Sequence, residues 1–176
     1  MVTPELRERA RSIRLLVLDV DGVLTDGTLY FSNAGEEIKA FNIQDGLGIK
    51  LLQATGVTVA IITGRQSRAL ELRAENLGVR YLYQGAEDKV TAFGDLLSTL
   101  TLMPSAAACM GDDLPDVPLM RRCGLAVSVP DAPTIVQSHA HYVTRKSGGH
   151  GAARELCELL MDAQGTLSSQ LEPYLK

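Results

Sequence analysis

Two kinds of hydrophobic pattern alternate along the chain. Short apolar runs rich in Val, Ile and Leu are typical of strands covered on both faces, and apolar residues recurring every three or four positions are typical of amphipathic helices. The predicted strands are residues 14–20, 57–62, 81–83, 106–110, 125–127 and 142–143, and the predicted helices are residues 45–54, 67–77, 89–100, 114–121, 134–138 and 151–163. This alternation predicts an α/β fold, with a Rossmann-like parallel sheet flanked by helices.

One segment departs from the alternation. Residues 28–31 and 36–41 flank the polar turn 32–35, which predicts a β-hairpin inserted after the first strand. The hairpin holds many of the chain's few aromatic residues, and a hairpin alone is only marginally stable in water. We therefore expect it to pack against a neighbouring subunit; the alternative is that it folds back onto its own sheet.

The chain length fits a single domain. No repeat or linker divides the 176 residues, so one domain is predicted over residues 1–176. The polar segment 166–176 is predicted to be a flexible tail.

Charge and composition exclude several classes of protein. The net charge of −4 disfavours a nucleic-acid partner, which would need a basic face. No apolar run reaches the roughly 20 residues that a bilayer crossing needs, so no membrane segment is expected. The three cysteines lack C-x-x-C spacing, which predicts reduced thiols and a cytoplasmic protein.

Two aspartates follow the first predicted strand directly. Asp19 and Asp21 are separated by one residue at the strand end, where ligands of parallel sheets bind. A carboxylate can attack a phosphate ester and form an aspartyl-phosphate, and a second carboxylate beside it can transfer the proton. This spacing favours phosphoryl chemistry, although paired aspartates can also simply cap the following turn.

Two further polar positions suit a phosphate. Thr63 and Gly64 follow the second predicted strand and offer a hydroxyl and a backbone amide to phosphate oxygens. Lys89 opens a predicted helix, where a cation is unfavourable unless an anion lies nearby. Taken alone, Thr63 is explained equally well as a helix cap, and Lys89 is better explained as an exposed surface lysine.

Three acidic residues cluster after the strand at 106–110. Asp112, Asp113 and Asp116 would repel one another without a cation, and Mg²⁺ is held in proteins by a few carboxylates together with water and phosphate. Asp112 is the best ligand candidate because it lies nearest the strand end. Asp113 and Asp116 could orient ligands or cap the next helix.

The ordered motifs resemble the haloacid dehalogenase superfamily of aspartate-nucleophile phosphatases. The sequence D-x-D-G-x-x-T-D-G comes first, then Thr-Gly after a strand, then a lysine and finally G-D-D-x-x-D. The resemblance implies catalytic roles for Asp19, Asp21, Thr63 and Lys89. It implies Mg²⁺ binding by Asp19, Asp21 and Asp112.

Residues 41–50, 62–65 and 148–155 resemble the 3-deoxy-D-manno-octulosonate 8-phosphate phosphatases within that superfamily. This likeness implies hydrolysis of that sugar phosphate in lipopolysaccharide precursor synthesis, no large cap domain, and a homotetramer built through the hairpins with a neighbour's C-terminal segment near the site. The alternative substrate is another sugar phosphate, such as a nine-carbon ulosonate 9-phosphate. The implied substrate-binding residues are Asp21, Asn42, Asp45, Gly46, Gly64, Arg65, Arg73 and Lys89.

Overall fold

A six-stranded parallel sheet forms the centre of the computed structural model, which describes residues 3–176. Its strand order is β5-β4-β1-β6-β7-β8, and each neighbouring pair is parallel. The strands are β1 (Leu15–Leu18), β4 (Thr58–Ile62), β5 (Tyr81–Tyr83), β6 (Ala107–Gly111), β7 (Leu125–Ser128) and β8 (Tyr142–Val143). The predicted parallel sheet is confirmed.

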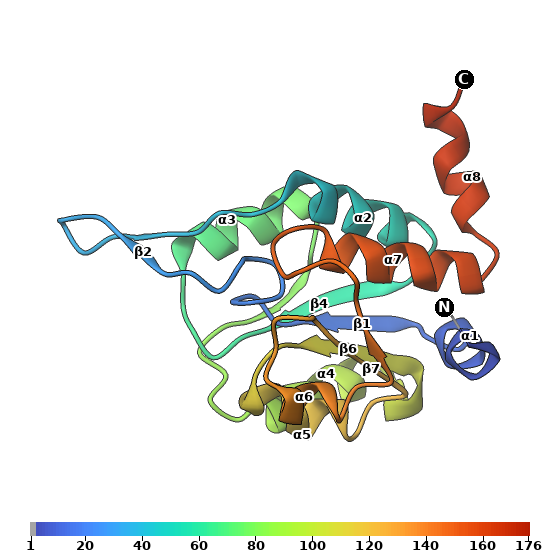
Figure 1. Ribbon diagram of the computed structural model, residues 1–176, viewed down its shortest axis with the longest axis horizontal. Coiled ribbons are helices and arrows are strands. Elements are labelled where there is room, and N and C mark those ends of the chain that lie inside the picture. The colour runs from blue at the N-terminus through green and yellow to red at the C-terminus, as the bar shows by residue number, and fades with distance from the viewer. Residues whose placement is uncertain (1–2) are drawn as a thin grey trace.

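Helices cover both faces of the sheet (Figure 1). One face carries α2 (Ile43–Ala54), α3 (Arg68–Leu77) and α7 (Ala152–Ala163). The opposite face carries α4 (Lys89–Leu100), α5 (Val117–Met120) and α6 (Thr134–Gln137). A further helix, α1 (Pro4–Arg11), precedes β1, and the side chain of Thr3 caps it. The apolar residues of the sheet and of the inner helix faces form one core.

Strand β1 lies at the middle of the sheet and all four of its residues are buried. Leu18, its last residue, pairs with Ile61 of β4 and Met110 of β6. The residues that follow these three parallel strands therefore meet at one edge.

The hairpin is present but shorter than predicted. Strands β2 (Tyr30–Phe31) and β3 (Glu37–Ile38) pair antiparallel and extend away from the sheet at the left of Figure 1. Large apolar side chains are exposed on it: Leu29, Tyr30, Phe31 and Ile38.

Two predicted segments differ in detail. The helix expected at 114–121 is a 3₁₀ turn, η2 (Leu114–Asp116), followed by α5, because a proline is the second residue of each piece and the Asp113 side chain caps the first. The segment 166–176 contains helix α8 (Leu167–Leu171) and the 3₁₀ turn η3 (Glu172–Tyr174). Apolar residues of α8 pack against the core, and its flexibility in solution stays a prediction.

Candidate active site

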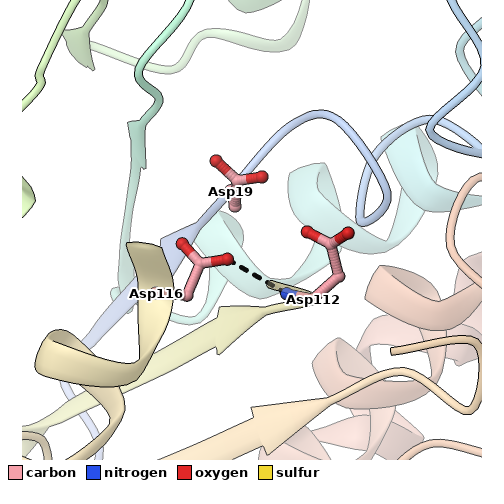
Figure 2. A group of neighbouring side chains, drawn as sticks. All are labelled: Asp19, Asp112 and Asp116. Atoms are coloured by element: carbon pink, nitrogen blue, oxygen red, sulfur yellow. Dashed lines mark hydrogen bonds between the residues drawn. The ribbon is translucent and has the colours of Figure 1, made fainter. Parts of the chain in front are cut away.

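Three aspartates from two strand ends meet at the carboxyl edge of the sheet. Asp19 follows β1, Asp112 follows β6, and Asp116 lies on the turn η2 (Figure 2). One carboxylate oxygen from each lies within 4.8 Å of the others. Asp19 and Asp112, both predicted from the sequence to lie at strand ends, are therefore neighbours in the structure.

Lys89 joins two of these carboxylates. As the first residue of α4, it donates to Oδ1 of Asp19 at 2.6 Å and to Oδ1 of Asp116 at 2.7 Å. Its side chain is only 7% exposed. Burial works to lower the pKa of Lys89, but the two carboxylates outweigh it and the pKa is raised. The ammonium is therefore charged and held against Asp19.

The remaining negative charge is poorly balanced. Burial, followed by repulsion from Asp116, raises the pKa of Asp19 to about 7, although Lys89 opposes the rise. Burial, followed by repulsion from Asp19 and Asp116, raises the pKa of Asp112 to about 7. A single ammonium does not neutralise three crowded carboxylates, so the site has the charge to accept a cation.

Asp116 has an organising role that the sequence left open. Its Oδ2 accepts hydrogen bonds from the backbone amides of Asp112 at 3.1 Å and Asp113 at 3.3 Å, and Figure 2 shows the first of these. Both of its oxygens are thus occupied, one by backbone and one by Lys89. Asp113 caps the turn, since its Oδ1 accepts from the amide of Leu114 at 2.8 Å. Of the three acidic residues in this motif, Asp112 is the one whose carboxylate accepts no hydrogen bond from residues 3–176.

Gly22 makes room for that carboxylate. Its φ is +95°, and a Cβ built there would lie 2.0 Å from Oδ2 of Asp112. A glycine is needed at this position for both reasons. The D-x-D-G sequence therefore provides the two aspartates of one strand and the space for a third from another.

Thr63 and Gly64 lie at the end of β4, beside the aspartates in the sheet order. Thr63 is buried, and its backbone is fixed by the amide of Ala86 and the carbonyl of Tyr83. At Gly64 a Cβ would meet only the carbonyl of Ala86, at 3.9 Å. The surrounding residues therefore leave space beside Gly64, and the absence of a side chain lets a ligand approach its backbone amide.

Asp21 belongs to a second charged group that includes the hairpin. Lys39, next to β3, donates to its Oδ1, and Nε of Arg65 lies 3.7 Å from its Oδ2. Arg65 also pairs with Glu37 of the hairpin. Lys39 and Glu37 were not among the site residues predicted from the sequence. Their position on either side of the exposed Ile38 could have indicated them, because residues two apart in a strand lie on the same face.

The other predicted substrate residues lie at the start of α2, except Arg73, which reaches it from α3. Asn42 caps α2 and donates to the carbonyl of Gly149 at 3.1 Å. Arg73 donates to the carbonyl of Asn42 at 2.9 Å, and a Cβ at Gly46 would lie 2.3 Å from its guanidinium. These contacts join α2 to α3 and to the glycine-rich loop 148–151.

Asp45 is buried and faces the start of α7. Its carboxylate accepts hydrogen bonds from the amides of Gly151 at 3.3 Å and Arg154 at 2.8 Å. It thus satisfies backbone donors at the N-terminus of that helix. The contacts give Asp45 a structural role, and direct substrate contact stays a prediction.

The fold is that of the haloacid dehalogenase-like hydrolases, and the sequence model of that family matches residues 82–156. The 3-deoxy-D-manno-octulosonate 8-phosphate phosphatase of Yersinia pestis is 51% identical over 166 residues, covering 94% of this chain and 89% of that protein. The protein of the same name from Escherichia coli K12 is 50% identical, covering 94% of this chain and 88% of that protein.

Solved structures agree with these sequences. The Moraxella catarrhalis 3-deoxy-D-manno-octulosonate 8-phosphate phosphatase, in complex with a magnesium ion, a phosphate ion and the sugar acid KDO, has a TM-score of 0.95 at 40% identity over 97% of this chain and 98% of that one. A probable YrbI family phosphatase from Pseudomonas syringae has a TM-score of 0.97 at 51% identity over 99% of both chains. The chain therefore belongs to the 3-deoxy-D-manno-octulosonate 8-phosphate phosphatase family of haloacid dehalogenase-like hydrolases.

Proposed function

We propose that this protein hydrolyses 3-deoxy-D-manno-octulosonate 8-phosphate to the free sugar acid and phosphate. The observation that carries the proposal is the cluster of Asp19, Lys89, Asp112 and Asp116 at the sheet edge, in a chain about half identical to phosphatases of that name. The reaction would serve lipopolysaccharide precursor synthesis in the cytoplasm. No helix among residues 3–176 has the length and apolar character that crossing a bilayer requires.

The nucleophile is Asp19. Its carboxylate attacks phosphorus, and the bond from phosphorus to the sugar oxygen breaks while Asp21 donates a proton to that oxygen. Asp21 then accepts a proton from the water that hydrolyses the aspartyl-phosphate. Lys89 donates to Asp19, so its ammonium lies where it can reach the phosphate oxygens that gain charge.

The phosphate oxygens have two further donors. The hydroxyl of Thr63 and the backbone amide of Gly64 end β4 beside Asp19, and the open space at Gly64 supports a close approach of a phosphate there. Together with Lys89 they would stabilise the equatorial oxygens of the transferring group.

The donor set fits a magnesium ion. Hard carboxylate oxygens crowd around one ammonium, and the free carboxylate of Asp112 has its own space beside Gly22. Asp19, the backbone carbonyl of Asp21 and Asp112 would hold the ion. When bound, Mg²⁺ neutralises phosphate charge that would otherwise repel the Asp19 carboxylate.

The sugar acid would be recognised around the phosphate. Arg65 is 44% exposed in its side chain and adjoins Asp21, which supports a contact with the substrate carboxylate. Asp21, Gly64 and Lys89 would contact the phosphate end. We assign Asn42 and Arg73 to the sugar, while the contacts of Asp45 and Gly46 support an indirect role through the α2 loop.

The assembly proposed is a homotetramer through the hairpins. Exposed apolar residues on β2 and β3 support it, since isolated hairpins rarely expose such side chains without a partner. Helix α8 projects from the end of the molecule opposite the hairpin (Figure 1), so a C-terminal segment near the site would belong to a neighbour.

A phosphate-release assay tests the proposed activity. The protein with Mg²⁺ should show a higher kcat/KM for the eight-carbon ulosonate 8-phosphate than for a nine-carbon ulosonate 9-phosphate. A preference for the nine-carbon ester would make that ester the substrate in place of the eight-carbon one. Absence of phosphate release from both esters and from a generic aryl phosphate would overturn the assignment as a phosphatase.

A further inference from the structure

Lys39 is buried on an otherwise exposed hairpin. Its side chain is 3% exposed, whereas that of the adjacent Ile38 faces solvent. Burying an ammonium is costly unless carboxylates surround it. Lys39 has two: it donates to Oδ1 of Asp21 and lies 3.1 Å from Oε1 of Glu37.

The contact with Lys39 makes the two oxygens of Asp21 unequal. Oδ1 accepts from Lys39, whereas Oδ2 is buried and has no hydrogen-bond partner among residues 3–176. The nearest cation to Oδ2 is Arg65, whose Nε lies 3.7 Å away, beyond hydrogen-bonding distance. One oxygen is therefore held in place, and the other has no hydrogen-bond donor that would compete for its lone pairs.

The four charges of this group balance. Asp21 and Glu37 face Lys39 and Arg65, but only Lys39 is both buried and in contact with the two carboxylates. Arg65 is 44% exposed and reaches Glu37 with its guanidinium end. Removing the Lys39 charge would leave Asp21 with no close hydrogen-bond donor and free to rotate.

We propose that Lys39 is a positioning residue for the proton transfers of Asp21. This inference rests on the proposed function, in which Asp21 protonates the leaving sugar oxygen. Lys39 fixes the carboxylate through Oδ1, Glu37 fixes Lys39 from the same strand face, and Oδ2 is left to transfer the proton. The hairpin thereby contributes to catalysis through one side chain, besides any part it has in assembly.

The test compares Lys39→Met, Lys39→Arg and Asp21→Asn on two substrates. The sugar phosphate needs a proton on its leaving oxygen, whereas p-nitrophenyl phosphate releases an anion that needs none. Lys39→Met should lower kcat on the sugar phosphate about a hundredfold, the smaller end of the usual range for acid–base catalysis, with little change in KM. The loss of kcat/KM on the aryl ester, which reports only the step that releases p-nitrophenolate, should be smaller, as for Asp21→Asn, and Lys39→Arg should recover part of the rate on the sugar phosphate.

Lys50→Met is the matched control, because Lys50 is an exposed lysine of α2. It should leave both rates unchanged, and melting temperatures should show that all variants are folded. A Lys39→Met rate within twofold of the control, an effect confined to KM, or equal losses of kcat/KM on both esters would overturn the positioning role. Wild-type protein inactive on both esters would instead refute the proposed function itself.

Discussion

At the scale of single residues, the site is defined by an excess of negative charge held in place by the fold. Lys89 neutralises part of it by bridging Asp19 and Asp116. Asp112 has no such partner among residues 3–176, and its raised pKa records burial beside the other carboxylates. The site therefore has the charge to bind a cation.

This charge excess predicts how pH and Mg²⁺ act together on stability. The pKa of Asp19 and of Asp112 rises from 3.8 in the unfolded chain to about 7 in the folded one, chiefly through burial. The folded chain therefore binds these protons more tightly, so their contribution favours folding below about pH 4 and is lost as pH rises to about 7. Mg²⁺ needs the ionised carboxylates, so it should raise the melting temperature more at about pH 8 than at about pH 5.5. Thermal melts with and without the ion measure this; equal increases at both pH values would contradict it.

The space beside Gly22 predicts a metal-specific defect. Gly22→Ala places a Cβ against the Asp112 carboxylate and strains a backbone with positive φ. We expect activity to require at least about tenfold more Mg²⁺, consistent with the loss seen when groups around a metal site are disturbed. A magnesium titration of the steady-state rate measures the change.

Gly94→Ala is the control for that substitution. Gly94 lies in α4, where an added Cβ meets nothing within 4 Å. It should leave the magnesium requirement unchanged and raise the free energy of unfolding by up to about 1 kcal/mol. An unchanged magnesium requirement in Gly22→Ala would remove Asp112 from the metal site.

At the scale of elements, the sequence is most informative where a buried strand ends. The apolar runs predict β1, β4 and β6, and parallel pairing brings the residues that follow these strands to one edge of the sheet. Asp19, Thr63 and Asp112 could therefore be grouped from the sequence alone. The helix expected at 114–121 became two short pieces because Asp113 caps a 3₁₀ turn. Such local competition between cap and helix is not visible in periodicity.

Long-range polar contacts were harder to predict. Lys39 and Asp21 are 18 residues apart and meet only because the hairpin folds toward the sheet edge. Asp45 and Arg154 are 109 residues apart and meet because α2 packs on α7. The apolar pattern fixes which helices pack together but leaves the partner of a single buried charge unspecified.

The contact of Asp45 with α7 predicts a stability effect. Asp45→Ala removes the acceptor for one buried and one partly buried amide and should lower the free energy of unfolding by about 1–2 kcal/mol. Asp45→Asn keeps an acceptor and should lose less. Urea denaturation measures both. A stable Asp45→Ala protein with a large increase in KM would instead identify Asp45 as a direct substrate contact.

At the scale of the whole molecule, the hairpin and α8 project from opposite ends (Figure 1). Phe31 is 60% exposed and Ile38 is 57% exposed. Replacing them by Phe31→Ser and Ile38→Thr should weaken association and shift the mass in light scattering toward that of one chain, because less apolar surface would be buried between subunits.

Met103→Ser provides the comparison for this pair. Met103 is 72% exposed and lies outside the hairpin, so its replacement should leave the mass unchanged. A single-chain mass for the unaltered protein, or an unaltered assembly in the double variant, would contradict assembly through the hairpins.

Rapid acid quenching tests most directly whether Asp19 carries the phosphoryl group. The Asp21→Asn variant with Mg²⁺ and p-nitrophenyl phosphate should accumulate the intermediate, because the aryl group leaves without a proton while water attack is slowed. Peptide mass spectrometry should then find one phosphoryl group on Asp19. Release of p-nitrophenolate with Asp19 unmodified throughout the first turnover, or the phosphoryl group on another residue, would contradict the account.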